Sequence, residues 1–317
     1  MEELDLLILG AGWTATFLIP LLASRGISFA ATTTSGRPVS NHPTIPFKFD
    51  PSAPTEITKS RIAALPRARY ILITFPLTGP GPSRLLAETY SSTHPTTNQQ
   101  DNSSVKTKFR FIQLGSTGVW QSSPSSQTSH TTINNECWIT RHSPLLSPTP
   151  RSDAEDELLS LGGCVLSLSG LYDGVARIPR NWIDRVGSTK ELVRAKGSLH
   201  MIHGVDVARA IAAIISPHDQ SEDRDDKWTA SCAGQRWMLT DGFVYDWWSL
   251  FASWAEPSDQ NGDPEPTKQA KWVFELMEEQ NVRGLPRSME QLKRCYDTRE
   301  FWQTFGLVPL KAGRVNM

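Results

Sequence analysis

A short apolar run near the N-terminus leads directly into a glycine-rich turn, and this junction constrains the fold more than any other feature. Leu6 to Leu9 precede Gly10-Ala11-Gly12-Trp13-Thr14-Ala15, a G-x-G-x-x-A pattern, and an apolar helical pattern begins near Trp13. In such a junction the first glycine permits a tight bend, the second lets the backbone approach a pyrophosphate, and the alanine lets the helix pack closely on the strand. Backbone N–H groups at the helix start then face the phosphates. The pattern predicts a dinucleotide site formed by Gly10, Gly12, Trp13, Thr14 and Ala15; the alternative is a turn that binds nothing.

Composition narrows the class of protein. The chain has 317 residues, enough for one large or two modest domains with a full hydrophobic core. Its net charge of -1 gives no basic footprint for nucleic acid or an anionic membrane. No window approaches the roughly 18 apolar residues of a membrane span, and the first strand begins too early for a signal peptide, so we expect a cytoplasmic protein. The four cysteines lie far apart without C-x-x-C spacing, which predicts neither a disulfide framework nor a metal site.

Short apolar runs alternate with helix-length segments along the first half of the chain, which is the pattern of α/β proteins. After the first strand, the predicted strands are Ile27–Thr32, Tyr70–Phe75, Phe109–Leu114 and Cys164–Leu168. Continuous apolar runs of this kind suit parallel strands covered on both faces. The sequence therefore predicts a Rossmann-type, doubly wound parallel sheet. Thr74, Phe75 and Pro76 are predicted to contact the cofactor.

We expect a dinucleotide-binding domain over residues 1–180 and a smaller substrate lobe over residues 181–317. The helical pattern from His203 to Ile215 is expected to pack back on the sheet. Two stretches rich in Ser, Thr, Asn and Pro, 91–107 and 121–150, are predicted loops, and the second falls where an active-site loop would lie.

The chain from about Trp182 onward is rich in tryptophan. Eight of the eleven tryptophans lie here, at Trp182, Trp228, Trp237, Trp247, Trp248, Trp254, Trp272 and Trp302. They predict a small aromatic core, with a substrate cleft lined by one or two rings as the alternative. A helix is expected over Ser288–Phe305, a polar linker over Pro257–Thr267 and a charged turn over Asp219–Lys227.

The residues after the second predicted strand bear on the choice of cofactor. Folds that prefer NAD carry an acidic residue about 20 residues past the glycine turn, where it binds the ribose hydroxyls. Here no acidic residue occurs between Asp5 and Asp50, and Thr33, Ser35 and Arg37 follow the strand instead. Hydroxyls and a guanidinium can bind a 2′-phosphate that a carboxylate would repel. The sequence therefore favours NADP over NAD, unless Arg37 is only a solvated loop cation.

Three further segments carry a resemblance to a known family. They are Leu114-Gly115-Ser116-Thr117-Gly118-Val119-Trp120, Leu168-Ser169-Gly170-Leu171-Tyr172-Asp173-Gly174 and His203-Gly204-Val205-Asp206-Val207-Ala208. Together with the glycine turn, this ordered set resembles the extended, NAD-dependent epimerase/dehydratase-like branch of the short-chain dehydrogenase/reductase superfamily. Within the last segment, Asp206 lies near a predicted helix start, where it can cap N–H groups and complement the helix dipole.

The resemblance implies a Tyr-x-x-x-Lys pair, in which the lysine lowers the pKa of a proton-transferring tyrosine. No tyrosine occurs between Tyr90 and Tyr172, and the matching segment places Ser147, or alternatively Thr149, in the tyrosine's position and Arg151 in the lysine's. The resemblance also implies that Ser116 or Thr117 polarises a substrate carbonyl. Tyr172 or His203 is the predicted substitute for proton delivery.

These observations predict an NADP-dependent oxidoreductase or epimerase acting on a small carbonyl or sugar-type metabolite. A non-catalytic NAD(P)-binding regulator or scaffold of the same fold is the alternative, because the usual proton relay is missing. A Rossmann-like methyltransferase is a third reading, in which the segment from His203 to Ala208 is not expected. The expected partner is a small-molecule substrate, with a homodimer left open.

Overall fold

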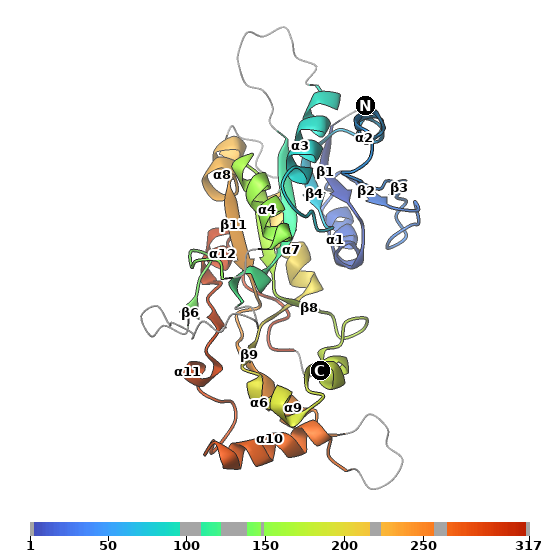
Figure 1. The fold of residues 1–317 in the computed structure, drawn as a ribbon. Helices are drawn as coiled ribbons and strands as arrows, with labels where there is room; N and C mark the ends of the chain where they lie inside the picture. Colours follow the sequence, from blue (N-terminus) through green and yellow to red (C-terminus); the bar gives the residue numbers. More distant parts are fainter. Residues whose placement is uncertain are drawn as a thin grey trace.

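The computed structural model describes residues 3–95, 109–121, 138–146, 149–215, 223–256 and 265–314. Its centre is a seven-stranded parallel sheet in the order β11-β7-β5-β4-β1-β2-β3 (Figure 1). The strands are β1 (Leu4–Leu9), β2 (Phe29–Thr33), β3 (Ile45–Pro46), β4 (Ala68–Ile73), β5 (Arg110–Ser116), β7 (Cys164–Leu168) and β11 (Gln235–Leu239). The predicted Rossmann-type sheet is confirmed, with strand boundaries shifted by one or two residues. Strand order reverses between β1 and β4, which is the position where doubly wound folds bind ligands.

Helices cover both faces of the sheet, and the alternation of side chains along β1 shows how. Leu6 and Ile8 face one core with α1 (Trp13–Ser24), α7 (Gly204–Ile214) and α12 (Arg299–Thr304). Leu7 and Leu9 face a second core with α2 (Thr55–Ala63), α3 (Pro82–Thr93) and α4 (Pro150–Ser160). The two faces of each strand thus enter different cores, as expected for a strand with a period of two.

The α7 helix packs beside α1 on the first of these faces. A Cβ at Gly204 would overlap the ring of Phe17, so only glycine allows the two helices to approach this closely. Nδ1 of His203 accepts from the backbone N–H of Val205 at 3.1 Å and caps α7. The fully buried carboxylate of Asp206 instead accepts from the backbone N–H groups of Leu310 and Lys311, at 2.7 and 2.8 Å. Asp206 is structural as predicted, but it holds the C-terminal segment, not the helix start.

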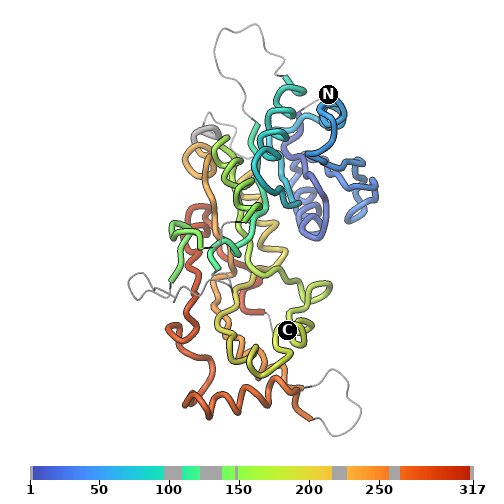
Figure 2. The backbone as a smooth tube through the Cα atoms, in the orientation of Figure 1, coloured from blue at the N-terminus to red at the C-terminus, as the bar shows by residue number. Residues whose placement is uncertain are grey.

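A smaller lobe lies below the sheet in Figure 1, and α10 forms its far end in Figure 2. Its helices are α5 (Ile183–Val186), α6 (Lys190–Ala195), α9 (Trp247–Ser253), α10 (Lys268–Glu279) and α11 (Met289–Leu292). Three strand pairs join segments distant in sequence: β8 (Gly170–Tyr172) with β10 (Met201–His203), β9 (Ser198–Leu199) with β12 (Tyr245–Asp246), and β6 (Trp138–Ile139) with β13 (Cys295–Tyr296). The predicted aromatic core is confirmed in the lobe, where Trp247, Trp248 and Trp254 pack together. Three other tryptophans, Trp228, Trp237 and Trp302, pack in the core between the sheet and α1, α7 and α12.

Three sequence predictions differ from the structure. The single helix expected over Ser288–Phe305 is wrong, because Lys293 adopts φ 68° and ends α11, after which β13 separates it from α12. Part of the charged turn expected over Asp219–Lys227 begins a helix, α8 (Asp223–Ser231). The loop expected over 121–150 contains β6, while 122–137 and 147–148 lie outside the described residues, as do residues 96–107 of the other predicted loop.

Within the described ranges, no helix is both long and apolar enough to cross a bilayer.

Candidate functional site

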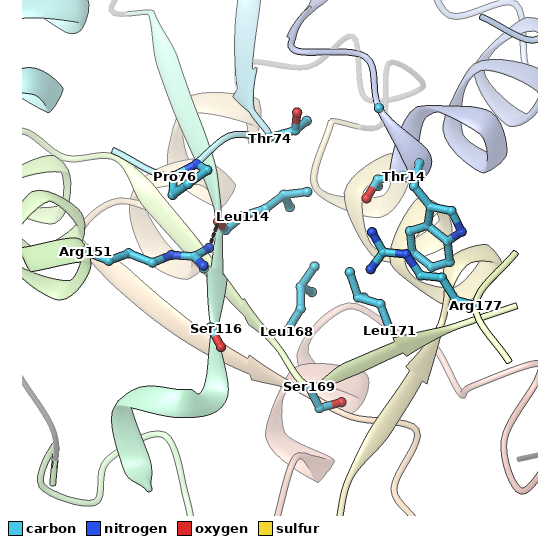
Figure 3. Close-up of a pocket in the computed structure, with 13 residues that line it drawn as sticks. Thr14, Thr74, Pro76, Leu114, Ser116, Arg151, Leu168, Ser169, Leu171 and Arg177 are labelled. Carbon is cyan, nitrogen blue, oxygen red and sulfur yellow. Dashed lines mark hydrogen bonds between the residues drawn. The ribbon is translucent and has the colours of Figure 1, made fainter. Parts of the chain in front are cut away.

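A cleft of about 290 Å³ opens at the carboxyl ends of β1, β4, β5 and β7, where the strand order reverses (Figure 3). Its lining combines the glycine turn, the strand ends, and two arginines. The lining residues are Gly12, Trp13, Thr14, Thr74, Pro76, Leu114, Gly115, Ser116, Arg151, Leu168, Ser169, Leu171 and Arg177. The structure therefore brings together seven predicted site residues: Gly12, Trp13, Thr14, Thr74, Pro76, Ser116 and Arg151.

The two glycines of the turn have different physical roles. Gly10 has φ 87°, and a Cβ there would lie 2.9 Å from Thr74 Oγ1 and from the ring of Phe75. Backbone geometry and packing therefore both require glycine at Gly10. Gly12 is exposed and lines the cleft, and a Cβ there would meet only Gly10 O, at 3.9 Å. Packing does not require glycine at Gly12, and the missing side chain leaves the backbone open to the cleft.

The start of α1 is also open to the cleft. Gly12 is the N-cap residue of α1, and no side chain caps the N–H groups of the first turn. Side chains at the ends of two neighbouring strands fix the turn. Thr32 Oγ1 accepts from Gly10 N at 3.0 Å, and Thr74 Oγ1 donates to Leu9 O at 3.1 Å. Uncapped N–H groups at a helix start attract anions through hydrogen bonds and the helix dipole.

A loop after β8 adds Arg177 to this wall of the cleft. The indole Nε1 of Trp13 donates to Asp173 Oδ2 at 2.6 Å, and the Arg177 guanidinium lies over the Trp13 ring, 4.4 Å from its centroid. Asp173 Oδ1 accepts from the backbone N–H groups of Val175, Ala176 and Arg177 at 2.7 to 2.8 Å. Partial burial opposes ionisation, but these N–H groups and the indole hold the pKa of Asp173 below its ordinary value.

Sequence reasoning did not identify Arg177 or Asp173. The available signal was the Asp173-Gly174 pair directly after a strand end on the ligand-binding edge of the sheet, with an arginine four residues after the aspartate. That signal is local, whereas the contact with Trp13 joins positions 160 residues apart.

The opposite wall is formed by α4 and β5. Arg151 donates from Nη2 to Leu114 O at 2.6 Å, and its Nε pairs with Glu155 Oε1 at 3.1 Å. Glu155 is fully buried and also pairs with Arg236. Gly115 leaves room for this carboxylate, because a Cβ there would lie 2.9 Å from Glu155 Oε1. The charge of Arg151 is therefore already engaged within the protein.

Two hydroxyls lie at the lower edge of the cleft in Figure 3. Ser116 Oγ accepts from Gly118 N at 3.1 Å. A hydroxyl that accepts one bond still has a hydrogen to donate, so Ser116 can donate to a ligand oxygen. Ser169 Oγ is buried and has no hydrogen-bond partner among the residues that the structure describes.

Two residues predicted to be catalytic do not line the cleft. Thr117 is buried, and its backbone carbonyl accepts from the Tyr296 hydroxyl at 3.1 Å. Tyr172 is also buried, and its hydroxyl donates to Lys311 O at 2.5 Å. Burial raises the pKa of Tyr172, which moves the phenol further from proton transfer at neutral pH. Burial lowers the pKa of His203, the other predicted proton donor, whose Nδ1 is engaged as the α7 cap.

Several residues predicted to bind cofactor lie beyond the cleft lining. Ala15 is buried, where its small side chain permits close packing, and Phe75 packs at Gly10. Thr33 shares a hydrogen bond of 2.9 Å with Thr44, while Ser35 and Arg37 are exposed at the end of β2. Ser147 lies outside the described residues, and Thr149 Oγ1 caps α4 by accepting from Ser152 N at 3.2 Å.

No protein-family model matches this sequence, and a search of curated proteins finds no match. Solved structures match over nearly the whole chain. A putative NAD-dependent epimerase/dehydratase from Methylobacillus flagellatus is 15% identical, with a TM-score of 0.55, covering 99% of this chain and 96% of its own. A short-chain dehydrogenase/reductase superfamily protein from Agrobacterium tumefaciens, solved with bound NAD, is 11% identical, with a TM-score of 0.56, covering 96% and 92%. This chain shares the fold of these two solved structures.

A third match is a functionally unknown conserved protein from Silicibacter pomeroyi, 17% identical with a TM-score of 0.56, covering 96% of this chain and 93% of that one. The resemblance predicted from the motifs is thus confirmed for the fold.

Proposed function

We propose that the chain binds a nicotinamide dinucleotide in the cleft, with the diphosphate at the start of α1. The observation that carries this proposal is the bare backbone at Gly12, which faces the cleft although packing leaves room for a side chain. The uncapped N–H groups of the first turn fit a diphosphate, because they supply donors and a positive dipole end. The bound NAD of the Agrobacterium tumefaciens structure, which shares the fold, also supports the proposal.

We propose an oxidoreductase or epimerase-like activity on a small carbonyl or sugar-type substrate. A bound nicotinamide would supply or accept a hydride. Ser116 would donate its free hydrogen to the substrate oxygen and polarise the carbonyl. Arg151, fixed by Leu114 O and Glu155, would face the cofactor's ribose. No carboxylate, imidazole or phenol lines the cleft within the described part of the chain, so water is the proposed proton source.

NADP is the proposed form of the cofactor. Thr33 is the last residue of β2, Ser35 and Arg37 follow it, and β2 pairs with β1 beside the glycine turn. Within the ranges that the structure describes, Arg37 is exposed and its guanidinium has no hydrogen-bonding or ionic partner, so it is free to pair with a 2′-phosphate. Replacing Arg37 with Gln should weaken NADPH binding and leave NADH binding unchanged.

A second candidate function is dinucleotide binding without turnover. The same lining favours it, because hydroxyl and guanidinium groups are inefficient proton donors at neutral pH. The cofactor pocket would then serve a regulatory or scaffold role.

Calorimetry with NADPH, NADP+, NADH and NAD+ tests dinucleotide binding, and NADPH oxidation across a panel of carbonyl compounds tests turnover. We expect the wild-type protein to bind NADPH, and Gly12→Ala to bind it about tenfold or more weakly while remaining folded. Uptake of none of the four forms would refute the proposal. Tight binding with no oxidation across a broad panel would select the second function.

A further inference from the structure

We propose that Arg177 is a phosphate-binding residue that closes over the dinucleotide's diphosphate from the side of the cleft opposite Arg151. This inference rests on the proposed function and extends it to a residue that lies outside the glycine-turn motif. The relevant elements are α1, which supplies Trp13, and the loop after β8, which supplies Asp173 and Arg177.

Geometry places the Arg177 guanidinium at the helix start. Its central carbon lies 4.4 Å from the centroid of the Trp13 ring, and Trp13 is the first residue of α1. Arg177 and Trp13 both line the cleft, and Figure 3 shows the guanidinium beside Thr14, across from Arg151. A diphosphate that accepts from the N–H groups of the first turn would therefore lie next to this guanidinium.

The charge of Arg177 is available to a ligand. Both carboxylate oxygens of Asp173 are engaged by backbone N–H groups and by the Trp13 indole. Among the described residues, no hydrogen bond or ion pair engages the Arg177 guanidinium, whereas Arg151 is held by Leu114 O and Glu155. Of the two arginines in the cleft, Arg177 is therefore the one whose planar fork of donors remains free for a phosphate.

Asp173 is the positioning residue for this contact. Its Oδ1 gathers three successive backbone N–H groups, which fixes the loop that carries Arg177, and its Oδ2 ties the loop to the Trp13 indole. The ring then supports the guanidinium through a cation–π contact. The helix start and the arginine are thereby held together as one unit.

Calorimetry at low salt with NADPH and with ADP-ribose tests the proposal. ADP-ribose keeps the diphosphate and lacks both the nicotinamide and the 2′-phosphate. We expect Arg177→Gln to weaken both ligands by a similar factor, about tenfold or more, and Arg177→Lys to restore part of the loss. The matched control is Arg25→Gln, which removes an exposed arginine at the opposite end of α1 and should leave both affinities unchanged.

The outcomes separate this inference from the proposed function. If the wild-type protein binds neither ligand, the proposed function fails. If the wild-type protein binds both and Arg177→Gln binds them equally well, only the role of Arg177 is refuted. An unchanged cofactor affinity with a raised KM for a carbonyl substrate would assign Arg177 to the substrate and would also overturn the inference. Thermal melting of each variant confirms that a lost affinity does not reflect a lost fold.

Discussion

The two walls of the cleft differ in what their charged groups contact. On the α1 wall, no side chain caps the helix start at Gly12, and among the described residues no hydrogen bond or ion pair engages the Arg177 guanidinium, which lies over the Trp13 ring. On the α4 wall Arg151 is bound to Leu114 O and to Glu155, which in turn binds Arg236. The first wall offers an anionic ligand uncapped N–H groups and a guanidinium, whereas the charged groups of the second wall pair with one another. The difference fits the proposed function, in which the α1 wall binds the diphosphate and the described lining of the cleft offers no carboxylate, imidazole or phenol for proton transfer.

Replacing Glu155 with Gln tests whether the α4 wall is structural. We expect a loss of about 3 kcal/mol in the free energy of unfolding, because the change removes the charge of the fully buried carboxylate that pairs with Arg151 and Arg236, and leaves Arg236 only the exposed carboxylate of Asp156. Urea denaturation measures the free energy of unfolding of each variant. The control is Asp156→Asn, which removes the exposed partner of Arg236 and should cost about 1 kcal/mol or less. Equal stabilities for the two variants would show that the buried pair does not support this wall.

Replacing Ser116 with Ala tests whether the α4 wall still serves chemistry. If the chain reduces carbonyl compounds, we expect kcat to fall about a hundredfold, because one hydrogen-bond donor to the reacting oxygen is lost. NADPH affinity should stay unchanged, since Ser116 lies at the opposite wall from the diphosphate. Steady-state kinetics measures kcat, and calorimetry on the same preparation measures the NADPH affinity. An unchanged kcat would show that Ser116 does not polarise the substrate.

Replacing Gly10 or Gly12 with Ala tests whether the two glycines of the α1 wall have different roles, Gly10 in the fold and Gly12 in ligand binding. We expect a loss of about 2 kcal/mol in the free energy of unfolding, because φ is positive and the new Cβ would overlap Thr74 and Phe75. Gly12→Ala should change stability by less than about 0.5 kcal/mol, since it meets no close atom. Chemical denaturation of both variants makes the comparison. A Gly12→Ala protein as unstable as Gly10→Ala would contradict the ligand-binding interpretation of Gly12.

The smallest expected effect concerns Asp173 and acid pH. Its pKa is lower in the folded protein than in the unfolded chain, so its ionised form stabilises the fold above its ordinary pKa near 4. This stabilisation is lost as the pH falls through the lower, folded pKa. We expect Asp173→Asn to reduce the acid dependence of the melting temperature below about pH 4, by an amount equivalent to about 1 kcal/mol or less at this partly exposed site. If the wild-type and Asp173→Asn proteins had the same melting temperature at every pH between 2.5 and 6, the ionised carboxylate of Asp173 would not stabilise the fold.

Local sequence patterns predicted the features that depend on neighbouring residues. The strand from Cys164 to Leu168 and the start of α1 at Trp13 match the structure, because burial on both faces and the glycine turn leave a clear local signal. The spacing also placed Gly12 and Thr14 in one predicted site, and both line the cleft.

Contacts between distant segments were not predictable in this way. Tyr172 sits in a family-like motif, yet its hydroxyl is taken by Lys311 O, which comes from a segment 139 residues later. Arg177 was missed for the same reason, since only the folded chain shows that Trp13 supports it. The break in the helix expected over Ser288–Phe305 arises at Lys293, whose positive φ no local pattern indicated.

The most direct test of the central claim is a crystal structure of the wild-type protein with NADPH. We predict that a diphosphate oxygen lies within hydrogen-bonding distance of the backbone N–H of Trp13 or Thr14, with the Arg177 guanidinium on the same group. A dinucleotide bound elsewhere, or a cleft without NADPH at a concentration that calorimetry shows to be saturating, would contradict the account.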